Sequence, residues 1–433
     1  MKLLLSMAFA ALGLSLVVDG EQADPFRDIS DRYVRLVLAV GQHDADYVDA
    51  YYGDPALKTQ AEAEKIPLAE IANRAATLEG DVTTTALPAS KDDAELWRQR
   101  KQYLQRQLSA LRARVSMLQG TRLTFDRESQ ALYDAVAPRH TDAEFAAIIA
   151  TLEARLPGDG PLIKRYETFK EGYVIPADRL DAVFKAAIRA CRDRTTQYIE
   201  LPPSENFTVE YVTGKSWGGY NWYQGNYRSL IQVNTDLPIY VERALDLACH
   251  EGYPGHHVYN VLLEKNLVRD RGWNEFTVYP LFSPQSLIAE GTANYGIEVA
   301  FSKADRMAFE RDALFPLAKL SSTKAKDYYE VMDLVEQLSY AGNEAARRYI
   351  DGQLDAAGAV AWLEKYAMMP RARAEQRLKF FDQYRSYVIN YNLGKDLVRS
   401  FIERRTKGDR SPRAKWEEFA NLLSSPRLPS GLK

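Results

Sequence analysis

The sequence predicts a mainly α-helical protein that forms one body with a small β element. Apolar residues recur at helical spacing over most of the chain, and only residues 206–235 change to the two-residue alternation of strands. No linker, internal repeat or low-complexity tract divides the chain. The 433 residues, 46% of them hydrophobic, supply ample material for a core. A net charge of -3 gives no electrostatic case for binding nucleic acid or an anionic membrane surface.

Residues 1–20 are predicted to be an export signal. Lys2 supplies a positive charge, Leu3 to Val18 is an uncharged apolar run, and small or branched residues follow at the expected cleavage point, Val18-Asp19-Gly20. Because the run is slightly long for a signal, its retention as a membrane anchor is the alternative. The remaining residues, 21–433, are expected to form a single periplasmic or secreted domain.

The N-terminal half of this domain, residues 21–203, is expected to be helical. The clearest helix follows Ser90, a good N-cap, and another begins at the capping box from Thr141 to Glu144. Glycines and prolines at 158–161 and 202–203 are predicted to end helices. The helix after Ser90 has an apolar stripe, for which core packing is the simpler interpretation and a coiled-coil partner the alternative. The stripe consists of Leu104, Leu108, Leu111, Val115 and Leu118.

The other half, residues 204–433, begins with the only stretch that favours strands. Phe207 to Val212 alternates, and Ser229 to Asn234 is expected to be a second strand of a hairpin, at the sheet edge where an extended peptide could bind. The aromatic residues of this stretch could bind a sugar or a peptide side chain, although cross-strand packing explains them at least as well. They are Tyr211, Trp217, Tyr220, Trp222, Tyr223 and Tyr227.

Three of the five histidines fall within eight residues, His250-Glu251-Gly252-Tyr253-Pro254-Gly255-His256-His257. Imidazole and carboxylate groups together bind zinc and activate a water on it, so this segment predicts a metal site. In the motif H-E-x-x-H, two histidines one turn apart share a helix face and the glutamate is the general base. Here Pro254 occupies the position of the second histidine. A kink or bulge at Pro254-Gly255 is therefore expected to bring His256 or His257 back toward His250.

The helix that carries His250 is expected to begin after Leu237-Pro238, because proline suits the first helical turn. Asp246, one turn before His250, is a candidate partner for the imidazole of a metal ligand. The two cysteines, Cys191 and Cys249, could pair in an oxidising compartment. Two buried thiols are favoured, because two cysteines do not make a disulfide framework.

The histidine-rich segment resembles the H-E-x-x-P-G-H-H signature of the bacterial domain-of-unknown-function family numbered 885. Members of that family resemble zinc-dependent peptidases of the gluzincin type. Its motif E-G-W-A followed by Y-x-E is similar to residues 290–298, with Thr292 in place of the tryptophan, and its motif Y-x-I-G is similar to Tyr391-Asn392-Leu393-Gly394. The resemblance implies a gluzincin-like helical fold with a deep cleft that admits short peptides.

A further helix is expected to begin near Pro284 and to place Glu290, Asn294 and Glu298 along one face. Apolar neighbours suggest that this face is buried, and a buried carboxylate needs a partner such as a metal. Glu290 is favoured as the third metal ligand, with Glu298 accepting a hydrogen bond from a ligand histidine. Helices are expected to continue from residue 300 to the end, with breaks near Gly342, Gly352, Pro370, Gly394 and Gly408.

These residues predict a hydrolase with one zinc ion, most simply a metallopeptidase that cleaves short peptides. His250, either His256 or His257, and Glu290 would bind the metal, with a slight preference for His256, and a fourth position would remain for water. Glu251 would take a proton from that water and pass it to the leaving amine.

Tyr391, and with less support Tyr295, could donate a hydrogen bond to the oxyanion formed during attack. Two alternatives to a peptidase remain. One is hydrolysis of a non-peptide amide or ester, and the other is a non-catalytic exported protein that binds peptide or sugar through its aromatic residues.

Overall fold

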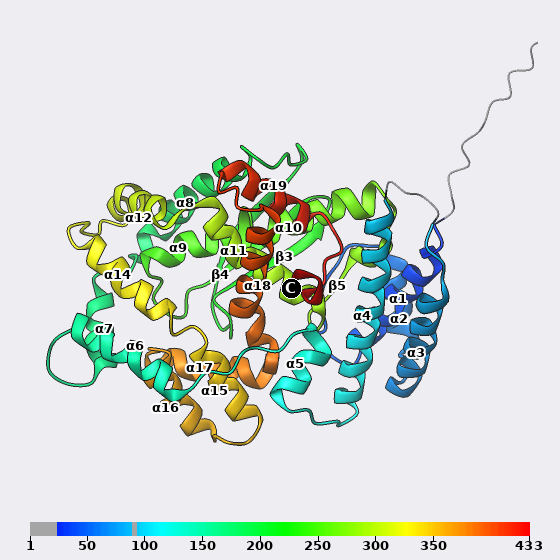
Figure 1. The fold of residues 1–433 in the computed structure, drawn as a ribbon, viewed down its shortest axis with the longest axis horizontal. Coiled ribbons are helices and arrows are strands. Elements are labelled where there is room, and N and C mark those ends of the chain that lie inside the picture. The colour runs from blue at the N-terminus through cyan, green and yellow to red at the C-terminus, as the bar shows by residue number, and fades with distance from the viewer. Residues whose placement is uncertain (1–23, 89–92) are drawn as a thin grey trace, which may run out of the picture.

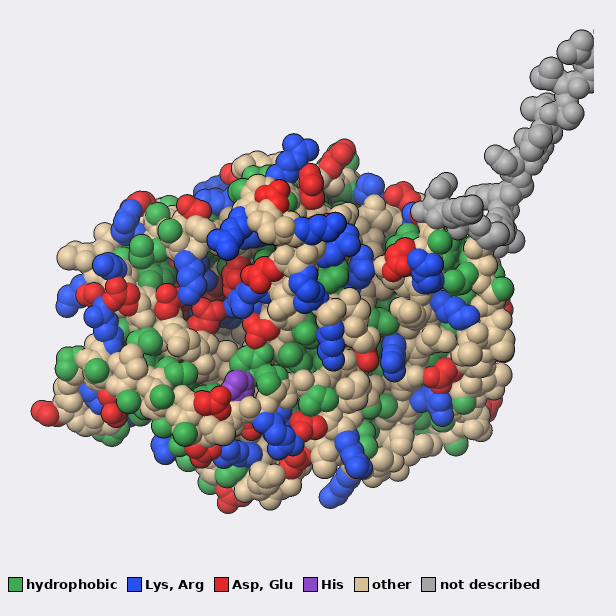
Figure 2. Space-filling view, in the orientation of Figure 1, with side chains coloured by type: hydrophobic (Ala, Val, Ile, Leu, Met, Phe, Trp, Pro, Cys, Tyr) green, Lys and Arg blue, Asp and Glu red, His purple; other side chains and the backbone are tan. Residues whose placement is uncertain are grey.

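The computed structural model describes residues 24–88 and 93–433 and is mainly helical, with two small sheets (Figure 1). The predicted export signal and the predicted N-cap Ser90 lie outside the described residues. None of the helices in the two described ranges combines the length and apolar character that a membrane crossing requires. The C-terminus lies near the centre of the view, and the molecular face in Figure 2 is hollowed beside α18, where acidic and basic side chains gather.

The elements follow one another along the chain with short connections. The α-helices are α1 (Arg27–Gly41), α2 (Pro55–Glu64), α3 (Leu68–Thr84), α4 (Ala94–Leu118), α5 (Phe125–Tyr133), α6 (Asp142–Arg155), α7 (Leu162–Glu171), α8 (Leu180–Thr195), α9 (Val241–Leu247), α10 (His256–Leu263), α11 (Pro284–Ala300), α12 (Lys303–Phe309), α13 (Phe315–Leu317), α14 (Ala325–Glu336), α15 (Ala341–Ile350), α16 (Ala356–Tyr366), α17 (Arg371–Tyr384), α18 (Ile389–Arg405) and α19 (Pro412–Leu423). Segments of 3-10 helix are η1 (Ala177–Arg179), η4 (Asn274–Thr277), η6 (Arg385–Val388) and η7 (Pro429–Leu432), and segments of wider π-helix are η2 (Ala248–Gly252), η3 (Glu264–Arg269) and η5 (Glu310–Leu314).

The predicted β region is a three-stranded sheet, and the expected hairpin of residues 207–212 with 229–234 is wrong because those two strands run parallel. Its strands β2 (Asn206–Val212), β3 (Gly219–Gly225) and β4 (Arg228–Asn234) lie in the order β2-β4-β3, with β4 parallel to β2 and antiparallel to β3. The prediction that the strand before the histidine-rich segment lies at an edge is wrong, because β4 is central. The two edge strands are β2 and β3, and β3 was not predicted.

A second sheet was not predicted. It pairs β1 (Val48–Tyr51) with β5 (Val278–Pro280) in antiparallel fashion. Both strands are short, and their pairing joins parts of the chain more than 200 residues apart. Such pairing depends on packing that no local sequence pattern records.

Several predicted helix signals are confirmed. The capping box is present at α6, where the Thr141 hydroxyl accepts from the Glu144 amide at 3.3 Å and the Glu144 carboxylate accepts from the Thr141 amide at 2.6 Å. Pro284 opens α11. The apolar stripe of α4 is packed into the core, with Leu104, Leu108, Leu111 and Val115 fully buried.

Two hydrophobic clusters form the core. One surrounds α9 and α10 and includes residues of α8, α19 and the three-stranded sheet, and the other joins α1, α3, α4 and α5 to α15, α16 and α17. The central helices α11 and α18 contribute to both clusters, as Ile288 and Leu287 do on α11. Each cluster therefore draws on both the 21–203 and the 204–433 parts of the chain.

The predicted break at Gly394 is wrong, because this glycine lies inside α18. It allows α18 to cross α11 closely: a Cβ added at Gly291 would lie 2.5 Å from the carbonyl carbon of Gly394, and one at Gly394 would lie 2.8 Å from the carbonyl oxygen of Leu287. Neither position has room for a side chain. The crossing brings the segment around Glu290 next to the segment that contains Tyr391.

Candidate metal centre

The histidine-rich segment is not a continuous helix. After α9 the chain widens into η2, which contains His250 and Glu251; Tyr253 is extended, and α10 begins again at His256. Gly255 packs directly on the preceding turn, because its amide donates to the Cys249 carbonyl at 2.9 Å and an added Cβ would lie 1.8 Å from the His250 carbonyl oxygen. The expected bulge is confirmed, and only glycine fits at its tightest point.

This bulge brings His250 and His256 together with Glu290 of α11. The Nε2 atoms of the two histidines are 3.1 Å apart, and they lie 3.2 Å and 3.7 Å from Oε2 of Glu290. All three side chains are largely buried, with 13%, 12% and 7% of their surfaces exposed. Among the described residues this is the one group of three or more histidine, cysteine or acidic side chains arranged closely enough to bind an ion.

The spacing of the three atoms fits a zinc ion. Ligand atoms at about 2.0–2.1 Å from a tetrahedral zinc lie roughly 3.3 Å from one another, which is close to the mean of the three distances above. Two imidazoles and one carboxylate are a donor set that zinc accepts, and they leave one tetrahedral position free for water or substrate.

Glu290 has one oxygen satisfied and one without a partner. The Tyr387 hydroxyl donates to Oε1 at 2.8 Å, whereas Oε2 is buried and has no hydrogen-bond partner beyond the two imidazoles near it. Burial opposes ionisation of this carboxyl, but His250 and His256 hold its pKa well below the usual range. The carboxylate is thus ionised, and its orphaned oxygen points to where a cation would sit.

The region is rich in negative charge. Burial favours neutral His256, but Glu290 raises the pKa of its imidazole to about 9, with Glu251 and Asp49 contributing. Asp49, on β1, was not predicted as part of this region, and burial raises its pKa to about 7 even though Tyr220 and His256 oppose that shift. A metal cation would offset this excess of carboxylates in place of the proton on His256.

Glu251 lies beneath β3 and is 4% exposed. Its carboxylate lies against Gly219, where an added Cβ would be only 2.6 Å from Oε1. The backbone carbonyl of Glu251 accepts a hydrogen bond from the side-chain amide of Asn221 at 2.7 Å. Burial raises the pKa of Glu251, against the lowering influence of His250 and His256. The carboxylate is therefore held beside the two imidazoles with more basic character than an exposed glutamate.

His257 lies outside the group of His250, His256 and Glu290, which is the candidate metal-binding group, so the structure does not support it as a ligand. Both ring nitrogens are occupied: Nδ1 accepts from the Ser229 hydroxyl at 2.9 Å, and Nε2 donates to Glu205 at 3.0 Å. The side chain is fully buried. Of the two candidates that the sequence left open, the geometry selects His256.

Two predicted supporting residues are placed elsewhere. Asp246 pairs with Arg306 at 2.8 Å, and Glu298 pairs with Arg399 at 2.6 Å and Lys395 at 3.0 Å. Neither carboxylate accepts a hydrogen bond from His250 or His256 in the structure. Glu298 lies eight residues after Glu290, which is about 12 Å along a helix and too far to share its surroundings. These contacts correct the expectation that both residues orient a ligand histidine.

The predicted tyrosines differ from each other. Tyr391, in the first turn of α18, is close enough to Glu290 and Glu251 that both carboxylates contribute, after burial, to the raised pKa of its hydroxyl. That hydroxyl has no hydrogen-bond partner among residues 24–88 and 93–433. Tyr295 instead packs edge-on against Phe419 and is part of the core.

Tyr387, which binds Glu290, was missed by the sequence analysis. It lies one turn before Tyr391, and this spacing is the only local signal that could have indicated it. In a chain with 26 tyrosines such spacing is not distinctive.

The aromatic residues of the three-stranded sheet are partly structural. Tyr223 is buried and donates to Glu264 at 2.5 Å, and Tyr220 donates to the Asp49 carbonyl at 3.2 Å. Trp222 and Tyr211 are 47% and 39% exposed. The first pair is held by contacts to η3 and β1, and the second pair has the most exposed rings among the six predicted aromatic residues.

Cys191 of α8 and Cys249 of η2 form a disulfide, with Cα atoms 5.7 Å apart. The expectation of two buried thiols is therefore wrong. Packing of α8 against η2 brings together two cysteines that lie 58 residues apart in the chain. The bond ties the residue before His250 to a neighbouring helix.

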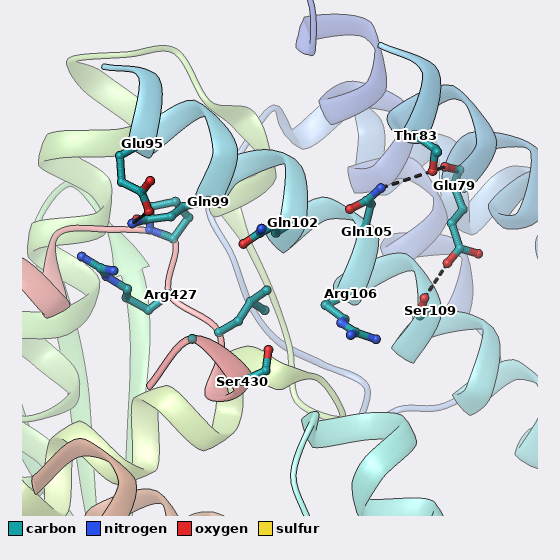
Figure 3. A pocket seen from close by; sticks show the side chains of 13 residues that line it. Glu79, Thr83, Glu95, Gln99, Gln102, Gln105, Arg106, Ser109, Arg427 and Ser430 are labelled. Carbon is teal, nitrogen blue, oxygen red and sulfur yellow. Dashed lines mark hydrogen bonds between the residues drawn. The ribbon is translucent and has the colours of Figure 1, made fainter. Parts of the chain in front are cut away.

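The structure also has a polar cavity of about 560 Å³ between α4 and the C-terminal segment (Figure 3). Gln105 donates to Thr83 and Ser109 donates to Glu79 at its wall. None of the residues that line it belongs to the metal-binding group. The cavity is therefore separate from the group of His250, His256 and Glu290.

No protein-family model matches the sequence, and no curated protein matches it. The structure is similar to that of a presumed lipoprotein from Colwellia psychrerythraea, with a TM-score of 0.52 and 14% sequence identity over 84% of this chain and 65% of that chain. The chain thus spans slightly less than two thirds of that protein's length, and the similarity concerns the fold. A presumed lipoprotein of unknown function from Shewanella oneidensis gives a TM-score of 0.46 at 15% identity, over 87% of this chain and 75% of that chain. The resemblance to the family numbered 885 stays a prediction.

Proposed function

We propose that the protein is a zinc-dependent hydrolase, most simply a peptidase, with His250, His256 and Glu290 as metal ligands. One observation carries the proposal: three buried ligand atoms lie at the mutual separation that zinc requires, and one of them, Oε2 of Glu290, has no other hydrogen-bond partner. A bound zinc ion would supply Lewis acidity, which lowers the pKa of a water and polarises a carbonyl group.

Glu251 is the proposed general base. Its carboxylate takes a proton from the attacking water and later delivers it to the leaving nitrogen. The water oxygen bonds to the amide carbon, the C–N bond breaks, and the products are a carboxylic acid and an amine. The raised pKa of Glu251 makes its carboxylate a stronger base than that of an exposed glutamate.

Tyr391 is the proposed donor to the oxyanion. Its hydroxyl lies close to Glu290 and Glu251, and no described side chain competes for its proton. The substrate chain would lie along β3, which pairs with β4 on one side only and has Gly219 directly over Glu251. A gluzincin-like cleft is part of this proposal.

The proposed location is outside the cytoplasm. The apolar run near Lys2 and the Cys191–Cys249 disulfide both support export, because disulfides persist in oxidising compartments. The description of the Colwellia protein as a presumed lipoprotein agrees with an envelope location.

The proposal is tested by metal content and by hydrolysis of a mixed library of short peptides, followed by mass spectrometry. The wild type should bind about one zinc and cleave peptides. Glu251→Gln should keep the zinc and lose activity by about 100 to 10,000-fold. Glu298→Gln is the matched control, since it makes the same change in an ion pair away from the metal-binding group, and it should keep most of the activity. Full activity in metal-free protein, or in Glu251→Gln, contradicts the proposal.

A further inference from the structure

Three arginines on α9 and α17 have no carboxylate of their own. Arg377 of α17 has no hydrogen bond or ion pair to any residue in the described ranges. Arg373, one turn earlier, donates only to the neutral carbonyl of Pro238, at 2.7 Å. Arg243 of α9 reaches Asp246 at 3.3 Å, but that carboxylate already pairs more closely with Arg306, at 2.8 Å. The three guanidinium groups thus have one shared carboxylate among them.

The two fully buried arginines of this protein are each paired with two carboxylates. Arg100 reaches Glu275 at 2.5 Å and Asp24 at 2.8 Å, and Arg347 pairs with both Asp126 and Glu344. Such pairing is the rule, because a guanidinium cannot lose its proton and its desolvation must be offset by an anion. Arg377 is half-buried and has no such anion, a state that it shares with Arg194 and Arg427, whose guanidinium groups donate only to the Ala190 carbonyl and the Ser425 hydroxyl.

The three arginines come from two helices. Arg243 lies on α9, seven residues before His250, and the helix widens into η2 between them. On α17, Arg373, Arg377 and Phe380 share one face. The Arg377 guanidinium lies 5.2 Å from the centre of the Phe380 ring.

Phe380 connects this face to the metal-binding group. Its ring centre lies 6.3 Å from that of Tyr387, which binds Glu290, and 6.2 Å from that of Tyr391, the proposed oxyanion donor. A further contact of α17, from Gln376 to the Lys215 carbonyl at 3.1 Å, places this helix beside the turn that leads into β3.

The candidate metal-binding group and the neighbouring arginines carry opposite charges. Glu290, Glu251 and Asp49 make the metal-binding group acidic, whereas Arg243, Arg373 and Arg377 make the neighbouring wall between α9 and α17 basic. Burial lowers the pKa of Arg377; the neighbouring Tyr391 opposes this shift and the positive charge of Arg243 adds to it. An anionic group on a substrate is repelled by the first region and attracted by the second.

We infer that Arg377, with Arg243 and Arg373, binds the free C-terminal carboxylate of a short peptide, so that the protein removes residues from the C-terminal end of its substrates. Guanidinium groups recognise carboxylates through paired hydrogen bonds, and every unblocked peptide has one such group at its end. This inference rests on the proposed function and specifies its substrate class.

Binding is tested first, independently of catalysis. Zinc-loaded Glu251→Gln protein is titrated calorimetrically with a short neutral peptide as its free acid and as its C-terminal amide. The free acid should bind roughly 100-fold more tightly, and Arg377→Met in the same background should remove that difference. Arg371→Met is the matched control, because Arg371 is exposed on the same helix and pairs with Glu375; it should leave the difference unchanged.

Kinetics then separate this inference from the proposed function. In the wild-type background, Arg377→Met should lower kcat/KM for the free acid to the value for the amide, mainly through KM, with zinc content unchanged. Arg377→Lys should recover part of the preference, which a merely misfolded variant would not do.

Equal binding and cleavage of acid and amide would overturn the inference and leave the proposed hydrolase intact. So would a preference that survives Arg377→Met, or one that follows acidic side chains in place of the C-terminus. If neither peptide is cleaved but the acid binds through Arg377, the proposed hydrolase fails and the carboxylate site stands.

Discussion

His256 and His257 are adjacent in sequence but lie in opposite kinds of environment. The His256 imidazole faces His250 and Glu290 in a group with a buried, unpartnered carboxylate oxygen. The His257 imidazole belongs to a closed network in which Glu205 also accepts from Tyr253 at 2.7 Å and pairs with Arg192 at 2.8 Å. Each polar atom of that second network has its partner within the protein.

The difference separates functional from structural use of the same residue type. Buried polar groups are normally satisfied within the fold, so a closed network needs nothing further, whereas an incomplete one implies a ligand. His257 ties α10 to β4 through Ser229 and to the segment before β2 through Glu205, and its role is structural. The group around His256 is the incomplete one.

The largest expected effect is on zinc content, when each of the two histidines is replaced in turn. His256→Gln should abolish zinc binding, because it removes one of the three proposed protein ligands. His257→Gln should keep about one zinc per chain. Metal analysis of both purified variants by mass spectrometry checks this, and zinc loss from His257→Gln with retention in His256→Gln would falsify the assignment.

A second effect is the pH dependence of zinc affinity. The pKa of His256 is raised to about 9 without metal, so below that pH a proton must leave before the imidazole can bind zinc. Affinity should therefore rise by about tenfold per pH unit between pH 7 and 9 and level off above.

Competition with a chelator of known affinity at each pH measures this slope. His257→Gln should show the same dependence as the wild type, because its imidazole is not a ligand. A flat profile in the wild type would show that no proton is displaced from the metal-binding group.

A smaller effect, on the stability of the fold, is expected from the network of Glu205 with His257, Tyr253 and Arg192. Burial disfavours the charged Glu205 carboxyl, but hydrogen bonds from His257, Tyr253 and Arg192 lower its pKa from 4.5 to about 2. A carboxyl with a lowered pKa stabilises the fold above its unfolded pKa and loses that contribution as the pH falls.

Glu205→Gln should thus lower the free energy of unfolding by about 1–3 kcal/mol at pH 7, with zinc retained. The difference from the wild type should shrink as the pH falls from 4.5 toward 2. Urea unfolding at a series of pH values tests both points, and a difference that is independent of pH would contradict the assigned ionisation.

The smallest expected effect, on both stability and zinc affinity, is that of replacing Glu298, the second glutamate of α11. Glu298 is partly exposed and pairs with Arg399 and Lys395, so Glu298→Gln should change the free energy of unfolding by no more than about 1 kcal/mol. Zinc affinity should stay at the wild-type value, whereas Glu290→Gln should lose the metal. Isothermal titration of the metal-free proteins with zinc measures both. A tenfold weaker affinity in Glu298→Gln would restore it as a supporting group of the metal centre.

Local sequence patterns were sufficient for much of the helical architecture. The capping box at Thr141, the start of α11 at Pro284 and the buried stripe of α4 depend on residues within a few turns of each other. The same holds for the bulge at Pro254-Gly255, where proline removes a hydrogen-bond donor and glycine allows close approach. These expectations needed no knowledge of the rest of the chain.

Tertiary structure alone decided the features that join distant segments. It paired Cys191 with Cys249, placed β4 between two other strands, brought Asp49 and Tyr387 to the metal-binding group, and turned Gly394 from an expected break into a helix crossing. It also chose His256 over His257, because that choice depends on which ring nitrogens Ser229 and Glu205 already occupy.

The residue types around His250 by themselves determined that a metal site was to be expected, since imidazoles and carboxylates in such density have few other uses. Which of them converge was decided by packing, because side-chain neighbours across a fold depend on the whole chain and not on local spacing.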